Sequence, residues 1–403
     1  MEDKKLNIRT YTWLQGGLSW AYVMARLMEA FEDMGHNALV CSTNGLENNN
    51  TFITQEKMLK SVLELQKFGP GKQAIDLDIT YTVPQNFPQR FLKNSKNKCA
   101  IYNYEVTYWH PDWKRFYHMA DFYFPSSDFS AEVFYINGVP PDKIFTIPHG
   151  VDTRVFNPSV PKVKLNTKKK FKFVAVCEPH YRKNLELLLT AYCEAFTAQD
   201  DVCLVLKTKI YRHSDGMYDM QKNPKGRKAF EIVLGDIFKK LHSRFGKNIP
   251  EIEVLSGFVD NVASIYNACQ CHVTTTGAEG FFMPGLESMA CGLLNIAPNY
   301  SGHLDFLNNN NSLLIDTKLR LAKDVEQYWT FNPKSKIGQP DKEHAIAMMR
   351  KAYIEYDSLM EKFRPNMKKT AELFSWARAA QMILDAIDGR MSPYVPGTYK
   401  LQK

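Results

Sequence analysis

The sequence TGAEGFFMPGLESMACG occupies residues 276–292, directly after the apolar segment 271–275. From Gly285 onward the spacing is helical, so a strand, a glycine-bearing turn and a helix follow one another. In a parallel sheet such a turn lies at the carboxyl end of the strand, where helix N-terminal amides bind anions and polar ligands. Glu279 precedes the helix and Glu287 lies inside it, so their carboxylates are candidates to accept hydrogen bonds from a ligand. A capping role and a surface position are the alternatives, and the flanking glycines disfavour them.

The same alternation of strand and helix extends over most of the chain. A first series begins with a strand at 6–12, the turn Gly16-Gly17 and a helix at 20–34, and a second begins with a strand at 171–176. Strand–turn–helix–strand units imply parallel sheets, so the fold class is α/β with two Rossmann-like domains. Two amphipathic helices are predicted near the end, at 343–364 and 366–387. A lysine-rich stretch at 158–170 is the candidate linker. The predicted domains span residues 1–160, 161–372 and, as a C-terminal helix and tail, 373–403.

The bulk properties narrow the class of protein. The chain has 403 residues and a formal net charge of +8, and it lacks the long apolar run that a transmembrane helix needs. Its first residues lead straight into a predicted strand with no secretory signal pattern, so a cytoplasmic protein is expected. Most of the eight cysteines lie in apolar segments, which favours buried thiols over disulfides or metal ligands.

The quoted segment resembles the donor-binding signature of the family-4 retaining glycosyltransferases, an EGFxxPxxEAMACG-like string. Ser288 replaces the usual alanine, and both glutamates are kept. The resemblance implies that Glu279 holds the hydroxyls of the transferred sugar and that Glu287 binds the nucleotide ribose. It also implies a donor-binding role for the amides of three residues, Gly280, Phe281 and Phe282.

Residues 178–184, EPHYRKN, resemble the G-R-x-x-x-R-K-G loop of the same family, with the first glycine and arginine replaced. The resemblance places Arg182 and Lys183 on the donor diphosphate, where two cations neutralise the charge of the leaving group. Lys207, at the end of the next strand, either adds a third positive charge or is a solvated strand end. The turn Gly16-Gly17 resembles the family's N-terminal glycine turn, which approaches the donor phosphates from across the cleft.

Three further segments agree with the family in order and spacing. They are IPHGVDTRVF at 147–156, SGHLDFL at 301–307 and FSW at 374–376. In the second of these, His303 stands where the family has glycine and Asp305 where it has glutamate. The resemblance implies the B-type glycosyltransferase fold, in which two Rossmann-like domains face each other across a cleft and a C-terminal helix crosses back to the first domain.

The implied reaction is metal-independent transfer of a hexosyl or pentosyl unit from a nucleoside diphosphate sugar to an acceptor hydroxyl, with retention of configuration. No cofactor is expected besides the donor substrate. Family members carry a histidine near the sugar, and either Glu105 or His110 occupies the matching region; Glu105 is preferred because it directly follows a strand. The predicted catalytic residues are Glu279, Glu105, Arg182 and Lys183. The acceptor is a saccharide, a lipid-linked or another hydroxyl compound.

Three other functions are considered, and the first two stay open. The basic stretches and the aromatic residues between 102 and 113 suit a nucleic-acid acceptor, which would make the protein a glycosylase of hydroxymethylated DNA bases. A non-catalytic nucleotide-sugar-binding protein would have the same pocket. A nicotinamide-dependent oxidoreductase is disfavoured because neither first strand is followed by GxGxxG.

Overall fold

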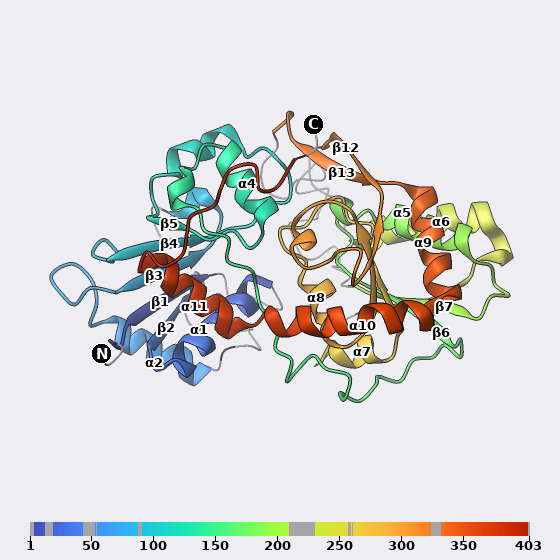
Figure 1. The fold of residues 1–403 in the computed structure, drawn as a ribbon, viewed down its shortest axis with the longest axis horizontal. Coiled ribbons are helices and arrows are strands. Elements are labelled where there is room, and N and C mark those ends of the chain that lie inside the picture. Colours follow the sequence, from blue (N-terminus) through green and yellow to red (C-terminus); the bar gives the residue numbers. More distant parts are fainter. Residues whose placement is uncertain are drawn as a thin grey trace. The chain divides into compact units, whose positions relative to one another are not determined.

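The computed structural model describes residues 4–12, 19–42, 53, 55–87, 91–208, 230–256, 259, 261–323 and 332–401. Contacts divide the chain into two compact units (Figure 1). The first comprises residues 1–104, 108–150 and 374–402, and the second comprises 105–107 and 151–373, with residue 403. The division therefore falls between Gly150 and Val151. The lysine-rich stretch at 158–170 lies against the second unit, where the Val163 N–H donates to Ser264 O (3.0 Å).

The first unit is built on a five-stranded parallel sheet in the order β2-β1-β3-β4-β5. Its strands are β1 (Asn7–Thr12), β2 (Asn37–Ser42), β3 (Leu77–Tyr81), β4 (Asn97–Ile101) and β5 (Phe122–Tyr123). Its helices are α1 (Ser19–Asp33), α2 (Gln55–Leu65), α4 (Asp128–Ile136) and α11 (Trp376–Ile387). α11 packs on α1, so the end of the chain belongs to this unit.

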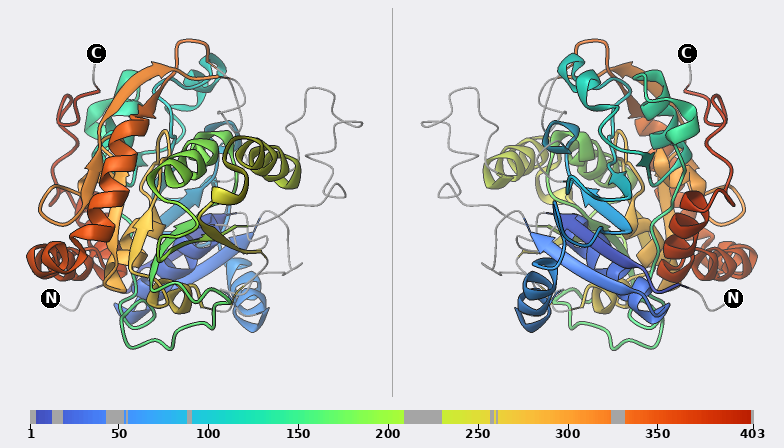
Figure 2. Two further views of the ribbon diagram at one scale, coloured as in Figure 1. Left: turned by 90° about the vertical axis from the view of Figure 1, so that its right-hand side faces the viewer. Right: turned by 90° about the vertical axis from the view of Figure 1, so that its left-hand side faces the viewer.

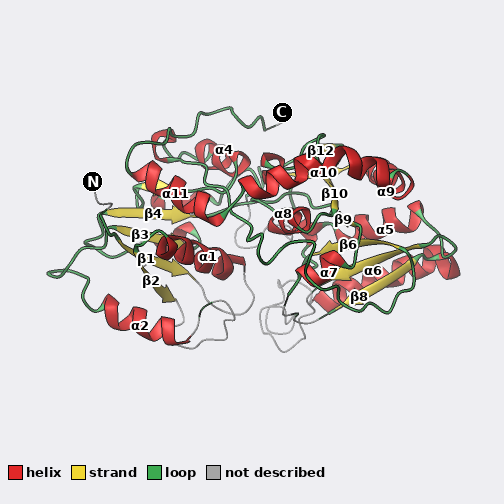
Figure 3. Ribbon diagram, turned by 60° about the horizontal axis from the view of Figure 1, so that its bottom comes forward, coloured by secondary structure: helices red, strands yellow, loops and turns green. Residues whose placement is uncertain are grey.

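The second unit is built on a six-stranded parallel sheet in the order β11-β10-β9-β6-β7-β8. The strands are β6 (Phe171–Val176), β7 (Val202–Lys207), β8 (Glu251–Leu255), β9 (Cys271–Val273), β10 (Leu294–Pro298) and β11 (Leu313–Ile315). The helices are α5 (Leu185–Ala195), α6 (Phe230–Phe245), α7 (Ala263–Asn267), α8 (Met283–Ala290), α9 (Lys342–Ile354) and α10 (Tyr356–Leu373) (Figure 3). Two parallel sheets covered by helices confirm the predicted α/β class with two Rossmann-like domains.

The predicted boundaries of the last helices were wrong. The sequence favoured a break at Pro365, yet α10 continues through this proline, and the breaks fall at Glu355 and at Ser375. Proline removes one backbone hydrogen bond from a helix. The apolar face of α10, which buries Phe363 and Met367 on either side of the proline, offsets that loss. At Ser375 the side chain accepts the Arg378 N–H (3.2 Å) and begins α11 as its N-cap.

An antiparallel hairpin between β11 and α9 was not predicted. It consists of β12 (Thr317–Leu321) and β13 (Lys336–Pro340), drawn in orange in Figure 2. Polar residues alternate with apolar ones in β12, whereas β13 shows no such alternation, and segments of five residues are too short to separate from a loop. In the part of the chain that the structure describes, no helix combines the length and the apolar character needed to cross a bilayer.

Candidate functional site

Two loops of the second unit form the site, and neighbouring strands deliver them. β6 leads into the turn η4 (Tyr181–Lys183), and β9 leads into residues 274–282 and then α8. β6 and β9 pair in parallel, so the two loops leave the same edge of the sheet. Two hydrogen bonds join them directly: Gly277 N–H donates to Arg182 O (2.8 Å), and Thr275 Oγ1 donates to Asn184 O (3.0 Å).

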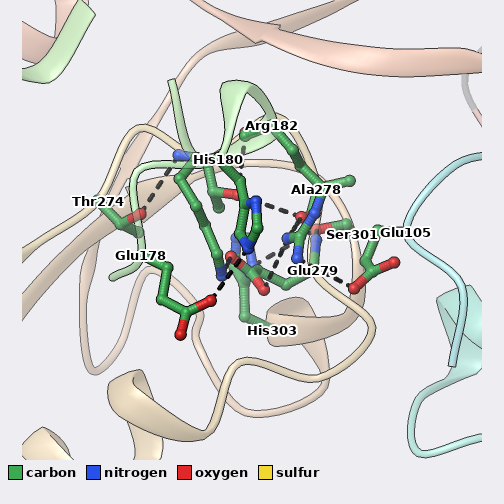
Figure 4. Close-up of polar contacts among 11 residues, drawn as sticks. Glu105, Glu178, His180, Arg182, Thr274, Ala278, Glu279, Ser301 and His303 are labelled. Atoms are coloured by element: carbon green, nitrogen blue, oxygen red, sulfur yellow. Dashed lines mark hydrogen bonds and ion pairs between the residues drawn. The ribbon is translucent and has the colours of Figure 1, made fainter. Parts of the chain in front are cut away.

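The predicted carboxylate of Glu279 and the two predicted cationic side chains lie in contact at this edge (Figure 4). The Glu279 carboxylate is 2.5 Å from Lys183 Nζ and 3.1 Å from an Arg182 guanidinium nitrogen. The same guanidinium donates to Ala278 O (2.6 Å) and lies 3.0 Å from Glu105 Oε1. The structure therefore brings together the four residues that the sequence assigned to catalysis, with Glu105–Thr107 grouped in the second unit by its contacts.

Glu279 is held as a carboxylate despite its burial. Only 5% of the residue is exposed. Burial alone would raise the pKa of Glu279, but the charges of Lys183 and Arg182, with hydrogen bonds from Lys183 and Thr276, lower this pKa to about 2. A buried charge is tolerated only when it is paired in this way. Glu279 is consequently an acceptor of hydrogen bonds throughout the physiological pH range.

Glu287 has the opposite electrostatics. It lies on α8, where its carboxylate accepts a hydrogen bond from the Tyr266 hydroxyl (3.2 Å). Burial raises the pKa of Glu287 to about 7, although the bond from Tyr266 acts in the lowering direction. The two glutamates of the signature therefore differ in charge state near neutral pH.

The loop between the glutamates is tightly constrained. Phe281 and Phe282 are both buried, and Phe282 caps α8 in the left-handed region (φ 84°). A residue other than glycine seldom adopts this conformation, and such strain concentrates at functional sites. Gly280 separates Glu279 from the two rings. The strain at Phe282 is a feature that no pattern in the sequence predicted.

Hairpin β12–β13 supports the same loop. The Gly338 N–H donates to Gly277 O (2.8 Å), and a Cβ added at Gly338 would lie 2.7 Å from that oxygen. A Cβ at Gly277 would lie 2.9 Å from the Ile337 side chain. The hairpin backbone therefore approaches the site loop at a distance that requires glycine on both sides.

The other predicted site residues are not part of this cluster of contacts or lie outside the described residues. Lys207 lies at the end of β7, where its carbonyl accepts the Cys177 N–H (3.1 Å) and burial lowers the pKa of its amine. His110 instead caps the turn η2 (Pro111–Phe116) by accepting the Asp112 N–H. Gly16 and Gly17 lie outside the described residues, so their predicted role in binding the donor stays a prediction.

The aromatic residues that suggested nucleic-acid binding are mostly core residues. The rings with at most 3% exposure are those of Tyr102, Tyr104, Trp109 and Trp113, whereas Tyr108 is 36% exposed. Tyr102 and Trp109 contact each other edge to face, and Trp109 packs in the same way on Phe134. A buried ring has no free face on which a base can stack, so this part of the nucleic-acid hypothesis loses its support.

Two site residues were not recognised as such from the sequence. The Glu279 N–H donates to Ser301 Oγ (2.9 Å), and the fully buried His303 lies beside Ser301. The signal available was His303 itself, because a histidine stands where the family has a glycine. Sequence comparison of the motif marked that departure without indicating what the imidazole contacts.

Comparison with known proteins supports the interpretation. Residues 220–330 match the family model described as "Glycosyl transferases group 1". The architecture is also that of solved glycosyltransferases. The chain has the B-type glycosyltransferase fold. No curated protein matches it in sequence.

The similarity of the chain to solved structures extends over 95% of its length in each of three examples. Sucrose-phosphate synthase of Thermosynechococcus elongatus is similar with a TM-score of 0.65, at 15% identity and 98% coverage of that chain. HepE of Anabaena, in complex with UDP and glucose, is similar with a TM-score of 0.61, at 12% identity and 100% coverage of that chain. A glycosyltransferase of Rickettsia africae has a TM-score of 0.61, at 14% identity and 98% coverage. At such low identity these structures establish the shared fold.

Proposed function

We propose that this glycosyltransferase transfers a hexosyl or pentosyl unit from a nucleoside diphosphate sugar to an acceptor hydroxyl, with retention of configuration and without a metal ion. One observation carries the proposal. The buried Glu279 carboxylate lies against both Lys183 and Arg182 at the edge of the sheet where β6 and β9 end. A carboxylate that can accept hydrogen bonds from sugar hydroxyls is thus in direct contact with two cations that can bind a diphosphate.

The division of labour follows from charge. Arg182 and Lys183 bind the diphosphate and stabilise the negative charge that develops on it as the bond to the sugar breaks. Two protein cations supply there what a metal ion supplies in metal-dependent transferases. Glu279 then accepts hydrogen bonds from the sugar hydroxyls, and its lowered pKa keeps it ionised for this task. Glu287 binds the ribose, and the backbone of Gly280, Phe281 and Phe282 contacts the sugar and phosphates.

Retention requires that departure and attack occur on one face of the sugar. The bond from the anomeric carbon to the diphosphate oxygen breaks, and a bond to the acceptor oxygen forms on the same face. The acceptor proton passes to the departing diphosphate oxygen, which lies beside it in this geometry. We assign to Glu105 a contact with the sugar near these atoms, and its ion pair with Arg182 supports this assignment. The acceptor is a hydroxyl compound such as a saccharide or a lipid-linked sugar.

UDP-sugars are the first donors to test, because HepE was solved in complex with UDP, with UDP-glucose, and with UDP and glucose. The experiment measures hydrolysis of UDP-, GDP-, ADP- and dTDP-sugars without an acceptor, in the presence and absence of EDTA. We expect slow release of one nucleoside diphosphate, unaffected by EDTA and lost in Glu279→Gln. Binding of a donor with no hydrolysis, and no transfer to any acceptor, would instead identify a nucleotide-sugar-binding protein. Loss of activity on EDTA treatment would contradict the metal-independent reaction.

A further inference from the structure

Glu279 is held through its backbone by a neighbouring turn. Its N–H donates to Ser301 Oγ (2.9 Å), and its carbonyl accepts the Gly302 N–H (2.9 Å). Ser301 and Gly302 follow β10 and begin the turn η7 (Gly302–Asp305). Both backbone groups of Glu279 are therefore fixed by one segment, while Lys183 and Arg182 hold its carboxylate. The position of that segment determines where the backbone of Glu279 lies.

His303 stands behind Ser301 in the same turn, and its side chain is fully buried. Its Nε2 is 2.6 Å from Pro298 O, and its Nδ1 is 3.5 Å from Ser301 Oγ. A carbonyl oxygen only accepts, so Nε2 carries the proton. Burial lowers the pKa of His303, which keeps the ring neutral and leaves Nδ1 as an acceptor.

These facts give the hydrogen bonds one direction. Ser301 Oγ accepts the Glu279 N–H, and its own proton is available for His303 Nδ1. A continuous chain then runs from the Glu279 N–H through the Ser301 hydroxyl and the His303 ring to Pro298 O. Figure 4 shows Glu279, Ser301 and His303 side by side. Ser301 itself has a positive φ of 83°, a conformation that needs such support from its surroundings.

His303 also contacts the far end of the donor loop. Its ring packs edge to face on Phe282, with centroids 5.6 Å apart. The ring of His272 packs on Phe282 as well, at 5.4 Å. Phe282 is the strained residue that begins α8. One imidazole thus supports the loop at Glu279, through Ser301, and at Phe282, through ring packing.

We propose that His303 is a positioning residue of the donor site, which orients the Ser301 hydroxyl and thereby fixes the backbone, and so the carboxylate, of Glu279. This inference rests on the proposed function of Glu279 and goes beyond it, because the histidine stands where the family has glycine. It assigns to His303 a role in aligning the sugar and none in binding the diphosphate.

Two variants of His303 separate its two ring nitrogens. His303→Asn keeps an acceptor near the position of Nδ1 and loses the bond to Pro298. His303→Gln can still reach Pro298 and loses the acceptor for Ser301. If Nδ1 positions Glu279, His303→Gln should lower kcat by about 10- to 100-fold, the scale of a small misplacement in an active site. His303→Asn should lower kcat clearly less. The melting temperatures of both variants show whether activity merely follows stability.

Ser301→Ala supplies the second arm and does not depend on how the His303 variants fold. It should lower kcat as His303→Gln does, and the double variant should be no worse than Ser301→Ala alone, because the histidine acts through the serine. The dissociation constant of the nucleoside diphosphate, which does not contact Glu279, should stay unchanged in all of them.

The outcomes distinguish this inference from the function on which it rests. Additive losses in the double variant, or equal kcat in His303→Asn and His303→Gln, would overturn the positioning role. Glu279→Gln is measured alongside. If it abolishes turnover while Ser301→Ala does not reduce it, the proposed function stands and the role of His303 fails. If Glu279→Gln is fully active, the proposed function itself fails.

Discussion

At the scale of single residues, Arg182 connects the two acids of the site. Its guanidinium contacts both Glu105 and Glu279, and arginine suits this task because its planar fork of donors binds two oxygens at once. A donor diphosphate competes for the same donors. On the proposed function, we expect donor binding to release Glu105 from this ion pair and to leave its carboxylate near the sugar.

This competition gives a prediction for Glu105→Gln. Removing the charge should lower kcat by about 100-fold if the carboxylate acts in the reaction. The dissociation constant of the donor should stay equal or become smaller, because Arg182 loses a competing partner. Steady-state kinetics and calorimetric titration measure the two quantities. His110→Ala is the control, since His110 caps η2, and it should leave kcat unchanged. The reverse ranking of the two variants would assign the role to His110.

The raised pKa of Glu287 has a consequence for stability. In the unfolded chain its carboxyl has a pKa near 4.5, and in the folded chain near 7. Between these values the folded state binds the extra proton, so this group's stabilising contribution is present below pH 4.5 and is lost as pH rises to 7. The free energy of unfolding of Glu287→Gln, relative to that of the wild type, should therefore increase as the pH is raised from 5 to 8.

Urea unfolding at pH 5 and pH 8 measures this difference. The matched control is Glu343→Gln, which makes the same substitution at a glutamate whose side chain is 77% exposed. A pH-independent difference for Glu287→Gln would show that the carboxyl of Glu287 is not perturbed in the folded protein.

At the scale of elements, hairpin β12–β13 packs on the donor loop and so connects to the site. Gly338→Ala places a methyl group against Gly277 O and should cost about 1–3 kcal/mol of stability. It should also lower kcat, because Gly277 lies next to the Glu279 segment. Gly235→Ala is the control: no atom lies within 4 Å of its added Cβ, and within α6 alanine should stabilise by about 0.5–1 kcal/mol. Equal effects of the two changes would contradict the close approach.

The elements also show what sequence reasoning captured. The strand and helix around residues 271–291 were predicted correctly, because a buried strand, a glycine turn and an apolar helical face leave few alternatives. The helix ends at Glu355 and Ser375 were missed because Pro365 gave a stronger local signal than the packing that overrides it. The hairpin and the contact of Ser301 with Glu279 depend on residues far apart in the chain, which no local pattern reports.

At the scale of the whole molecule, the chain joins two parallel α/β units, and its final helix belongs to the first of them. Leu373 ends α10 in the second unit, and α11 packs on α1 in the first. The chemistry described above lies in the second unit, in the turn after β6, the loop after β9 and the turn after β10, with Glu105 grouped there. The central claim is that these segments form one binding site for a sugar diphosphate, in which Glu279 binds the sugar and two cations bind the phosphates.

Calorimetric titration of three proteins tests that claim most directly. The wild type, Glu279→Gln and Arg182→Ala with Lys183→Ala are each titrated with the donor found in the hydrolysis screen and with its nucleoside diphosphate. Charge-assisted hydrogen bonds contribute about 1.5–3 kcal/mol each, so the double variant should bind both ligands at least about 100-fold more weakly. Glu279→Gln should weaken binding of the sugar donor and leave the diphosphate bound as tightly as before, or more tightly. Wild-type affinity for the diphosphate in the double variant would contradict the account.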